Sequence, residues 1–222
     1  MANGETKNVL IVGGTGTIGS GIAKSLLVKG YNVIVASPNE DKYRAVFGDK
    51  IDRCHFLKLD VTENENIIAE IISNAFARFG EIGTLIYAAG VHSNASFYKV
   101  DAECFDNALG VNLKGCFFTC QKFCLELERH SYQGKIIIIN SISAYNPSLL
   151  PGQISKWGVR GLIAGMGQFN KDIIKVYGIA PHMIGDGVEM GTTALEYVVL
   201  KTIDIIEDRG ALNSGETILL GE

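Results

Sequence analysis

Short runs of branched aliphatic residues alternate along this chain with segments in which apolar residues recur every three or four positions. The first run is Val9-Leu-Ile-Val, and the residues from Ile22 to Leu27 then repeat at helical spacing before Gly30. A continuous apolar run predicts a strand buried on both faces, whereas the wider spacing predicts an amphipathic helix that ends at the glycine. The start of the chain therefore predicts a strand, a glycine-rich turn and a helix.

The same alternation continues to the end of the chain. Further strands are predicted at residues 32–36, 55–59, 84–88, 135–140, 175–180 and 217–220, and long helices at residues 102–129, 153–171 and 193–207. Thr62 and Glu65 have the spacing of a capping box, which predicts a helix that begins at Thr62 and ends at Gly80. Alternating strands and helices predict an α/β fold, a doubly wound parallel sheet of about seven strands with helices on both faces. Because no repeat or linker interrupts the pattern, residues 1–222 are expected to form a single domain.

The glycine-rich turn lies between the first predicted strand and helix. In such a unit, glycines permit a tight turn, close approach of a pyrophosphate and close packing of the helix on the strand, and the helix N-terminus would bind the diphosphate. The spacing is GxxGxxG rather than GxGxxG. A glycine turn that binds nothing is therefore the alternative, but the position directly after a buried strand favours a dinucleotide. The turn residues expected to contact it are Gly13, Thr15, Gly16, Thr17, Ile18 and Gly19.

The end of the second predicted strand would lie beside the adenosine ribose. An acidic residue there binds the 2′-hydroxyl of NAD, and a nearby arginine accommodates the phosphate of NADP. This chain has Ser37-Pro38-Asn39 at that point, and the basic residues Lys42 and Arg44 follow acidic neighbours. The sequence therefore leaves the choice between NAD and NADP open.

Composition and charge exclude several other classes of protein. The chain has 222 residues, 47% of them hydrophobic, and a net charge of −4, which gives no indication of a nucleic-acid partner. Neither a signal peptide nor an apolar run long enough to span a membrane is present in the sequence, so a cytoplasmic protein is expected. Cys116, Cys120 and Cys124 lie four residues apart, and we expect them to pack as small apolar residues rather than to bind a metal.

With these elements in place, the sequence resembles the short-chain dehydrogenase/reductase family over nearly its full length. The matches come in the family's order, and it is their order and spacing together that carry the resemblance. The matching residues are Gly13, Gly16, Gly19, Asp60-Val61, Ala88-Ala89-Gly90, Val111-Asn112, Ser141, Ser155-Lys156, Gly161-Leu162 and Ala180-Pro181.

The resemblance implies a Rossmann-type fold, an NAD or NADP cofactor, a small-molecule carbonyl or hydroxyl substrate, and a role for each matching residue. Ser141 would bind the substrate oxygen, Lys156 the hydroxyls of the nicotinamide ribose, and Asn112 a water in a proton relay. Donors of this kind suit the reaction because hydride transfer to a carbonyl builds negative charge on oxygen. The cofactor would further contact Ser37, Asp60, Val61, Ala88, Ala89, Gly90 and Pro181.

The sequence departs from the family at the acid. The family's motif is Tyr-x-x-x-Lys, but Gly152 stands four residues before Lys156. Tyr145, in the segment after Ser141, is the candidate substitute, and two histidines, His92 and His182, are further candidates because each follows the end of a predicted strand.

We therefore expect an NAD(P)-dependent oxidoreductase with altered acid–base residues. The alternative from another class is a non-catalytic dinucleotide-binding protein that acts as a sensor, scaffold or partner subunit, and the glycine at position 152 favours it. A third possibility is a different substrate class such as a nucleotide sugar, which the GxxGxxG spacing indicates only weakly. A homodimer or homotetramer is expected in each case, because closed symmetric assemblies are common and the family pairs the helices predicted at 102–129 and 153–171.

Overall fold

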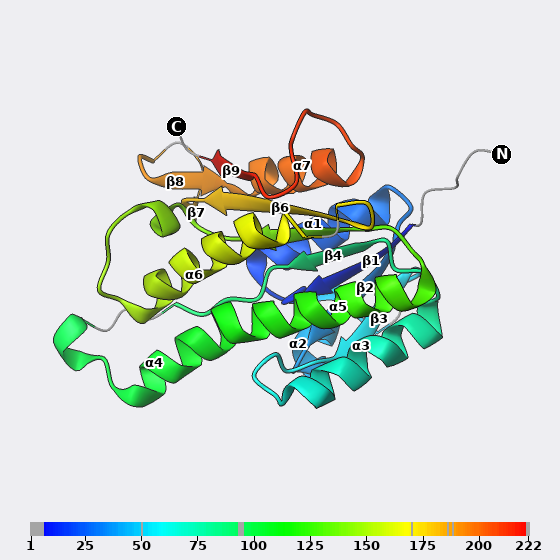
Figure 1. Ribbon diagram of the computed structural model, residues 1–222, viewed down its shortest axis with the longest axis horizontal. Helices are drawn as coiled ribbons and strands as arrows, with labels where there is room; N and C mark the ends of the chain where they lie inside the picture. Colours follow the sequence, from blue (N-terminus) through cyan, green and yellow to red (C-terminus); the bar gives the residue numbers. More distant parts are fainter. Residues whose placement is uncertain are drawn as a thin grey trace.

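The computed structural model describes residues 7–49, 51–92, 96–169, 171–185, 187 and 189–220 of the chain. Its centre is a parallel sheet of seven strands (Figure 1). In spatial order the strands are β3 (Cys54–Lys58), β2 (Asn32–Ser37), β1 (Asn8–Val12), β4 (Thr84–Tyr87), β5 (Gly134–Ile139), β6 (Ile174–Pro181) and β9 (Thr217–Leu220). Every neighbouring pair is parallel. The predicted α/β fold with a doubly wound parallel sheet is therefore confirmed.

Helices cover both faces of the sheet because successive side chains of a strand point to opposite sides. In β1, Leu10 and Val12 pack into the core that contains α3 (Glu65–Phe79), α5 (Cys116–His130) and α6 (Pro151–Met166). Val9 and Ile11 pack into the other core, with α1 (Thr17–Val28), α2 (Glu40–Phe47) and α7 (Leu195–Ile206). All four of these apolar side chains are buried, as the continuous apolar run predicts.

Three predicted features are corrected by the structure. The cap of α3 is Asn64, whose side chain accepts a hydrogen bond from the N–H of Asn66, so the predicted box of Thr62 and Glu65 is wrong. The helix predicted over 102–129 is divided into α4 (Ala102–Leu109), a π-helical turn η2 (Gly110–Gly115) and α5. The helices predicted at 153–171 and 193–207 are the shorter α6 and α7.

Some elements were not predicted. The helix α2 is short and polar, and the apolar pattern did not indicate it. Its cap is Asn39, whose side chain accepts a hydrogen bond from the N–H of Lys42. Beyond Pro181, where a loop was expected, Met183–Gly185 (β7) pairs with Thr192–Ala194 (β8). The predicted loop also contains Asp186, which lies outside the described residues.

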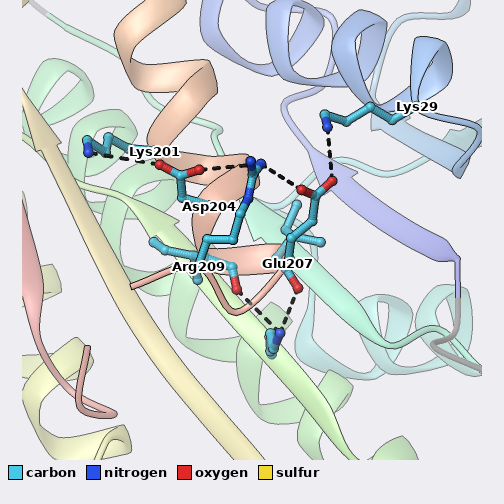
Figure 2. A network of polar contacts seen from close by, with 8 residues as sticks. Lys29, Lys201, Asp204, Glu207 and Arg209 are labelled. Carbon is cyan, nitrogen blue, oxygen red and sulfur yellow. Dashed lines mark hydrogen bonds and ion pairs between the residues drawn. The ribbon is translucent and has the colours of Figure 1, made fainter. Parts of the chain in front are cut away.

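The first and last helices are joined at their C-terminal ends by a small network of ion pairs (Figure 2). Lys29, the C-cap of α1, contacts Glu207 at 3.1 Å, and Arg209 contacts the same carboxylate at 2.6 Å. Arg209 also contacts Asp204 at 3.4 Å. Because the side chain of Gly21 is absent, Leu195 and Val199 of α7 lie directly against α1. The helix that follows the glycine turn is therefore packed on two sides.

The strand order places a crevice at the carboxyl ends of β1 and β4. The chain runs outward from β1 through β2 to β3 and then crosses to β4 on the other side of β1. In an open α/β sheet, ligands bind where the strand order reverses in this way. The residues that follow β1, β4 and β5 therefore define the candidate site.

Candidate active site

The glycine turn brings the backbone after β1 close to the backbone after β4. Gly13 has a φ of +76°, and a Cβ on it would lie 2.5 Å from the nitrogen of Ala89. A Cβ on Gly19 would overlap the carbonyl oxygen of Gly13. Neither position accepts a side chain without backbone movement. By contrast, a Cβ on Gly16 would meet only the Gly13 oxygen, at 3.3 Å.

The N-terminus of α1 is arranged to receive an anion. Gly16 is its N-cap, no side chain caps the helix, and its first turn contains no acidic residue. The helices α2, α3 and α4, in contrast, begin with Asn39, Asn64 and Asp101, whose side chains accept hydrogen bonds from the helix backbone. The first N–H groups of α1, from Thr17 onward, therefore keep the positive end of the helix open to a ligand.

The predicted adenosine side has a set of small polar contacts. The hydroxyls of Thr15 and Ser37 lie 3.1 Å apart, and both residues are buried. Asp60 Oδ1 accepts hydrogen bonds from the backbone nitrogen and the hydroxyl of Thr62. Val61 lies so close to Gly115 that a Cβ there would be 2.8 Å from the Val61 oxygen. This packing fixes the loop after β3 against the π-helical turn.

The segment after β4 passes beneath two predicted site residues. A Cβ on Gly90 would lie 3.5 Å from Asn112 Oδ1 and 3.8 Å from Lys156 Nζ. Gly90 is exposed, and Ala88 and Ala89 are partly exposed. The fold thus brings together Gly90, Asn112 and Lys156, which are distant in sequence and come from three elements.

Asn112 holds the segment after β4 with its side-chain amide. Oδ1 accepts the N–H of Val91 at 2.8 Å, and Nδ2 donates to the Val91 oxygen at 3.1 Å and to Ser155 Oγ at 2.9 Å. Ser155 Oγ in turn donates to the Gly152 oxygen at 2.6 Å. Asn112 and Ser155 are buried. The amide therefore ties the Val91 backbone to the first turn of α6.

Tyr87 contacts the π-helical turn that carries Asn112. A π-helical turn interrupts the regular helical hydrogen bonds and is frequent at functional sites. The hydroxyl of Tyr87, the last residue of β4, donates to the Val111 oxygen at 2.6 Å. Sequence reasoning assigned no role to Tyr87 and did not include Ser155 among the site residues. The available signals were that Tyr87 directly precedes the matching residues Ala88-Ala89-Gly90 and that Ser155 belongs to the matching pair Ser155-Lys156.

The amine of Lys156 is bound and desolvated. Nζ donates to the Ile139 oxygen at the end of β5, at 3.0 Å. Although the residue keeps some exposed surface, burial of the amine lowers the pKa of Lys156 to about 8, against the small opposing effect of Cys116. Desolvation disfavours the charged form of an amine, which is the reason for this direction.

The residues after β5 form a short turn with one unexplained amide. Ser141 Oγ accepts the N–H of Ser143 at 3.2 Å and lies 3.0 Å from its hydroxyl. Among the described residues, the buried Asn140 has no hydrogen-bond partner for either of its side-chain polar atoms. Such a group costs about 1–3 kcal/mol unless water or a ligand binds it.

Tyr145, the predicted substitute acid, lies with its ring against Arg160. The guanidinium of Arg160 lies 4.1 Å from the centre of its ring, and Arg160 also donates to the Ala144 oxygen at 3.4 Å. Arg160 follows Lys156 by one helical turn, away from Gly152. Pro181 is buried at the end of β6, and the N–H of His182 donates to Thr193 Oγ1 at 3.0 Å.

Two cavities lie at opposite edges of the sheet. One of about 330 Å³ is lined by the segment after β4 and by α4, including Val91, His92, Asp101 and Cys104. Another of about 900 Å³ lies at the amino ends of β4, β5 and β6, away from the glycine turn. There, Lys135 Nζ is already bound to Asp208 and to two α7 carbonyls. The smaller cavity is the one that adjoins the candidate site.

Comparison with known proteins identifies the family to which this site belongs. The sequence profile described as short chain dehydrogenase matches residues 7–195, most of the chain. The chain belongs to the short chain dehydrogenase family. The resemblance seen in the sequence motifs is thereby confirmed.

Individual members of the family are similar to this chain at modest identity. Short-chain dehydrogenase reductase 3c of Arabidopsis thaliana is 30% identical over 81% of this chain and 71% of its own length. Acetoacetyl-CoA reductase of an Acinetobacter species is 29% identical over 91% of this chain and 81% of its own length. L-rhamnose 1-dehydrogenase (NADP(+)) of Thermoplasma acidophilum is 26% identical over 65% of this chain, and the match spans only 58% of that enzyme.

Solved structures agree on the fold. Sorbitol-6-phosphate 2-dehydrogenase from Erwinia amylovora has a TM-score of 0.83 at 23% identity, with 96% of this chain and 97% of that chain covered. The structure of ElxO with NADP bound has a TM-score of 0.82 at 25% identity, with 97% of each chain covered. Within the described part of this chain, no helix has the length and apolar character needed to cross a membrane.

Proposed function

We propose that this protein is an NAD(P)-dependent oxidoreductase that interconverts a carbonyl and a hydroxyl group on a small molecule. The observation that carries the proposal is that Lys156 and Asn112 lie together at Gly90, directly after Ala89, against which Gly13 of the glycine turn packs. Family membership supports it, and the comparisons give no support to a non-catalytic sensor or scaffold.

The cofactor is NAD or NADP, and the residues present fit a dinucleotide. The uncapped N-terminus of α1 offers backbone donors to a diphosphate, and the space beside Gly16 is open to one. The buried amide of Asn140 has no partner among the described residues, as expected where a ligand completes a site. When bound, the nicotinamide ring supplies or accepts a hydride.

The proposed roles of the chain's own residues follow from their chemistry. The hydroxyl of Ser141 binds the substrate oxygen, and the cationic form of Lys156 binds ribose hydroxyls and lowers the energy of negative charge nearby. Asn112 holds the floor beneath them through its bonds to Val91 and Ser155. The predicted contacts of Ser37, Asp60, Val61 and Pro181 with the cofactor remain proposals.

Gly152 is proposed to leave the site without the family's tyrosine. A positioned general acid contributes about 10²–10⁴-fold to a rate. We therefore expect slow turnover of common carbonyl substrates rather than none, because orientation of the reactants still lowers the barrier.

The test is absorbance of the reduced nicotinamide during incubation with a panel of aldehydes and ketones. Ser141→Ala should lower any turnover by about 10²–10³-fold, as expected for loss of one donor to a developing oxyanion. Ser73→Ala on α3 is the matched control, since that hydroxyl lies 3.5 Å from Arg129 and far from the crevice. Turnover that survives Ser141→Ala and Lys156→Met would place the chemistry elsewhere. Tight dinucleotide binding without turnover of any carbonyl would favour the non-catalytic alternative.

We also propose that the chain forms a homodimer or homotetramer. Apolar side chains are exposed on three helices beside the site, where a partner subunit would cover them: Phe105, Phe117, Leu125, Ile154 and Trp157. Light scattering at tens of micromolar, about the range where a standard interface is saturated, should give a mass at least twice the monomer's. A monomeric mass would contradict this proposal.

A further inference from the structure

Gly152 and His92 face each other across the mouth of the candidate site. Gly152 is buried in the first turn of α6, one turn before Lys156. A Cβ added to it would lie 3.7 Å from the Val91 oxygen and 4.0 Å from His92 Nδ1. Both are ordinary contact distances. A side chain at position 152 would therefore project against the imidazole of His92.

The backbone directly before His92 is held by hydrogen bonds from the side chain of Asn112. The side chain of Asn112 accepts a hydrogen bond from the N–H of Val91, the residue before His92, and donates one to the Val91 carbonyl. Asn112 also donates to Ser155, which in turn donates to the Gly152 carbonyl. The residue directly before His92 is thus held against α6 by a buried network.

His92 also connects the site to solvent. It is exposed and lines the cavity of about 330 Å³. His92 lies two residues after Gly90, and a Cβ added to Gly90 would contact Lys156 Nζ. The ionisable groups that face this end of the site are Asp101, Glu103 and Cys104 in the cavity and Lys156 on α6.

We propose that the imidazole of His92 is the catalytic proton donor for carbonyl reduction, taking the place left by Gly152; this rests on the proposed function. Reduction of a carbonyl to an alcohol needs a hydride at carbon, which a reduced nicotinamide would supply, and a proton at oxygen. The carbonyl π bond breaks, an N–H bond of the His92 ring breaks as its proton forms the new O–H bond, and the electron pair of that N–H bond stays on the ring nitrogen. Because His92 is exposed, water returns the proton to the ring. Imidazole is the side chain best suited to such transfer near neutral pH.

The two other candidates are placed less well. The ring of Tyr145 lies against the guanidinium of Arg160, one helical turn beyond Lys156. His182 follows β6, with its backbone bound to Thr193.

The first test needs no turnover. The chain has four histidines, and their ring resonances can be assigned with His→Gln variants after labelling with ¹³C-histidine. Oxidised NADP (or NAD, whichever binds) should shift the His92 resonance strongly, whereas the matching ADP-ribose, which lacks nicotinamide, should shift it little. His55 and His130, on β3 and α5, should not respond to either. Saturating dinucleotide binding without a nicotinamide-dependent shift at His92 would overturn the proposal. If no dinucleotide binds, both this proposal and the proposed function fail.

The second test is kinetic. His92→Gln should lower kcat by about 10²–10⁴-fold without weakening dinucleotide binding. Free imidazole should partly restore activity to His92→Ala, and His130→Gln is the matched control. In a Gly152→Tyr background, which offers a second donor, the cost of His92→Gln should become small. Undiminished kcat in His92→Gln, or a loss confined to Tyr145→Phe, would overturn the proposal.

Discussion

The buried amine of Lys156 should make stability depend on pH in a specific way. Burial lowers its pKa from 10.5 to about 8 in the folded protein. In the unfolded chain the amine returns to its ordinary value, so between pH 8 and 10.5 the unfolded state holds a proton that the folded state has released. Stability rises with pH wherever the unfolded state binds more protons. The cost of burying the charge is therefore fully present below pH 8 and is relieved above it.

The size of this effect follows from the shift. One pKa unit corresponds to about 1.4 kcal/mol. The shift of the Lys156 pKa from 10.5 to about 8 therefore changes the free energy of unfolding by about 3 kcal/mol between these two pH values. Other groups titrate in the same range and act in the opposite direction. Burial raises the pKa of Cys124 to about 12 and also raises that of Tyr43. The comparison must therefore be made against a variant that keeps these groups.

Lys156→Met is that variant, because it keeps an unbranched side chain of similar length and removes the titrating amine together with its hydrogen bond to the Ile139 oxygen. Urea unfolding of both proteins at several pH values from 7 to 10.5 gives the difference in free energy at each pH. We expect wild type to gain about 3 kcal/mol relative to Lys156→Met as the pH rises through this window. Parallel curves for the two proteins would refute the reasoning.

Three further changes test individual contacts. Tyr87→Phe should lower the free energy of unfolding by about 1–3 kcal/mol in urea, because the Val111 carbonyl loses its partner; no change would show that water replaces the hydroxyl. Asn140→Leu should raise the melting temperature of the cofactor-free protein, because it removes an unsatisfied amide, and should reduce the further stabilisation by dinucleotide; an unchanged ligand response would separate Asn140 from the site. Lys29→Met should cost no more than about 1 kcal/mol at low salt and nothing at high salt, since the pair with Glu207 is partly exposed; a larger, salt-independent cost would contradict this.

Much of the fold was predictable because a single rule carries it. Buried parallel strands are continuous apolar runs such as Val9-Leu-Ile-Val, and the connecting helices repeat at wider spacing, so strand positions could be located directly. The glycine turn was predictable for a similar reason, since Gly13 and Gly19 lie where no side chain fits.

The missed features depend on contacts that periodicity does not encode. A single π-helical turn shifts the spacing of apolar residues only slightly, so the interruption at Gly110–Gly115 was not recognised in the sequence. Thr62 and Asn64 are both good capping residues, and only the backbone geometry selects Asn64. The sequence gives Tyr87 only as an aromatic residue of the core, and the hydrogen bond from its hydroxyl to the Val111 carbonyl is visible only in the structure.

The candidate site was predictable in part. Lys156, Asn112 and Ser141 were identified from their order along the chain, and the structure brings Lys156 and Asn112 to the same glycine. The proximity of His92 to Gly152 could not be derived, because the two residues are sixty positions apart and neither belongs to a periodic segment there.

Calorimetric titration with NAD, NADH, NADP and NADPH is the most direct measurement of the proposed function. At least one dinucleotide should bind to the wild-type protein and to Gly165→Val, whose position on α6 has open space around it. Gly16→Val should fold and yet fail to bind, because its side chain would occupy the space at the open end of α1. No heat and no thermal shift with any of the four at millimolar concentration, or equal binding by Gly16→Val, would contradict a dinucleotide site at this turn.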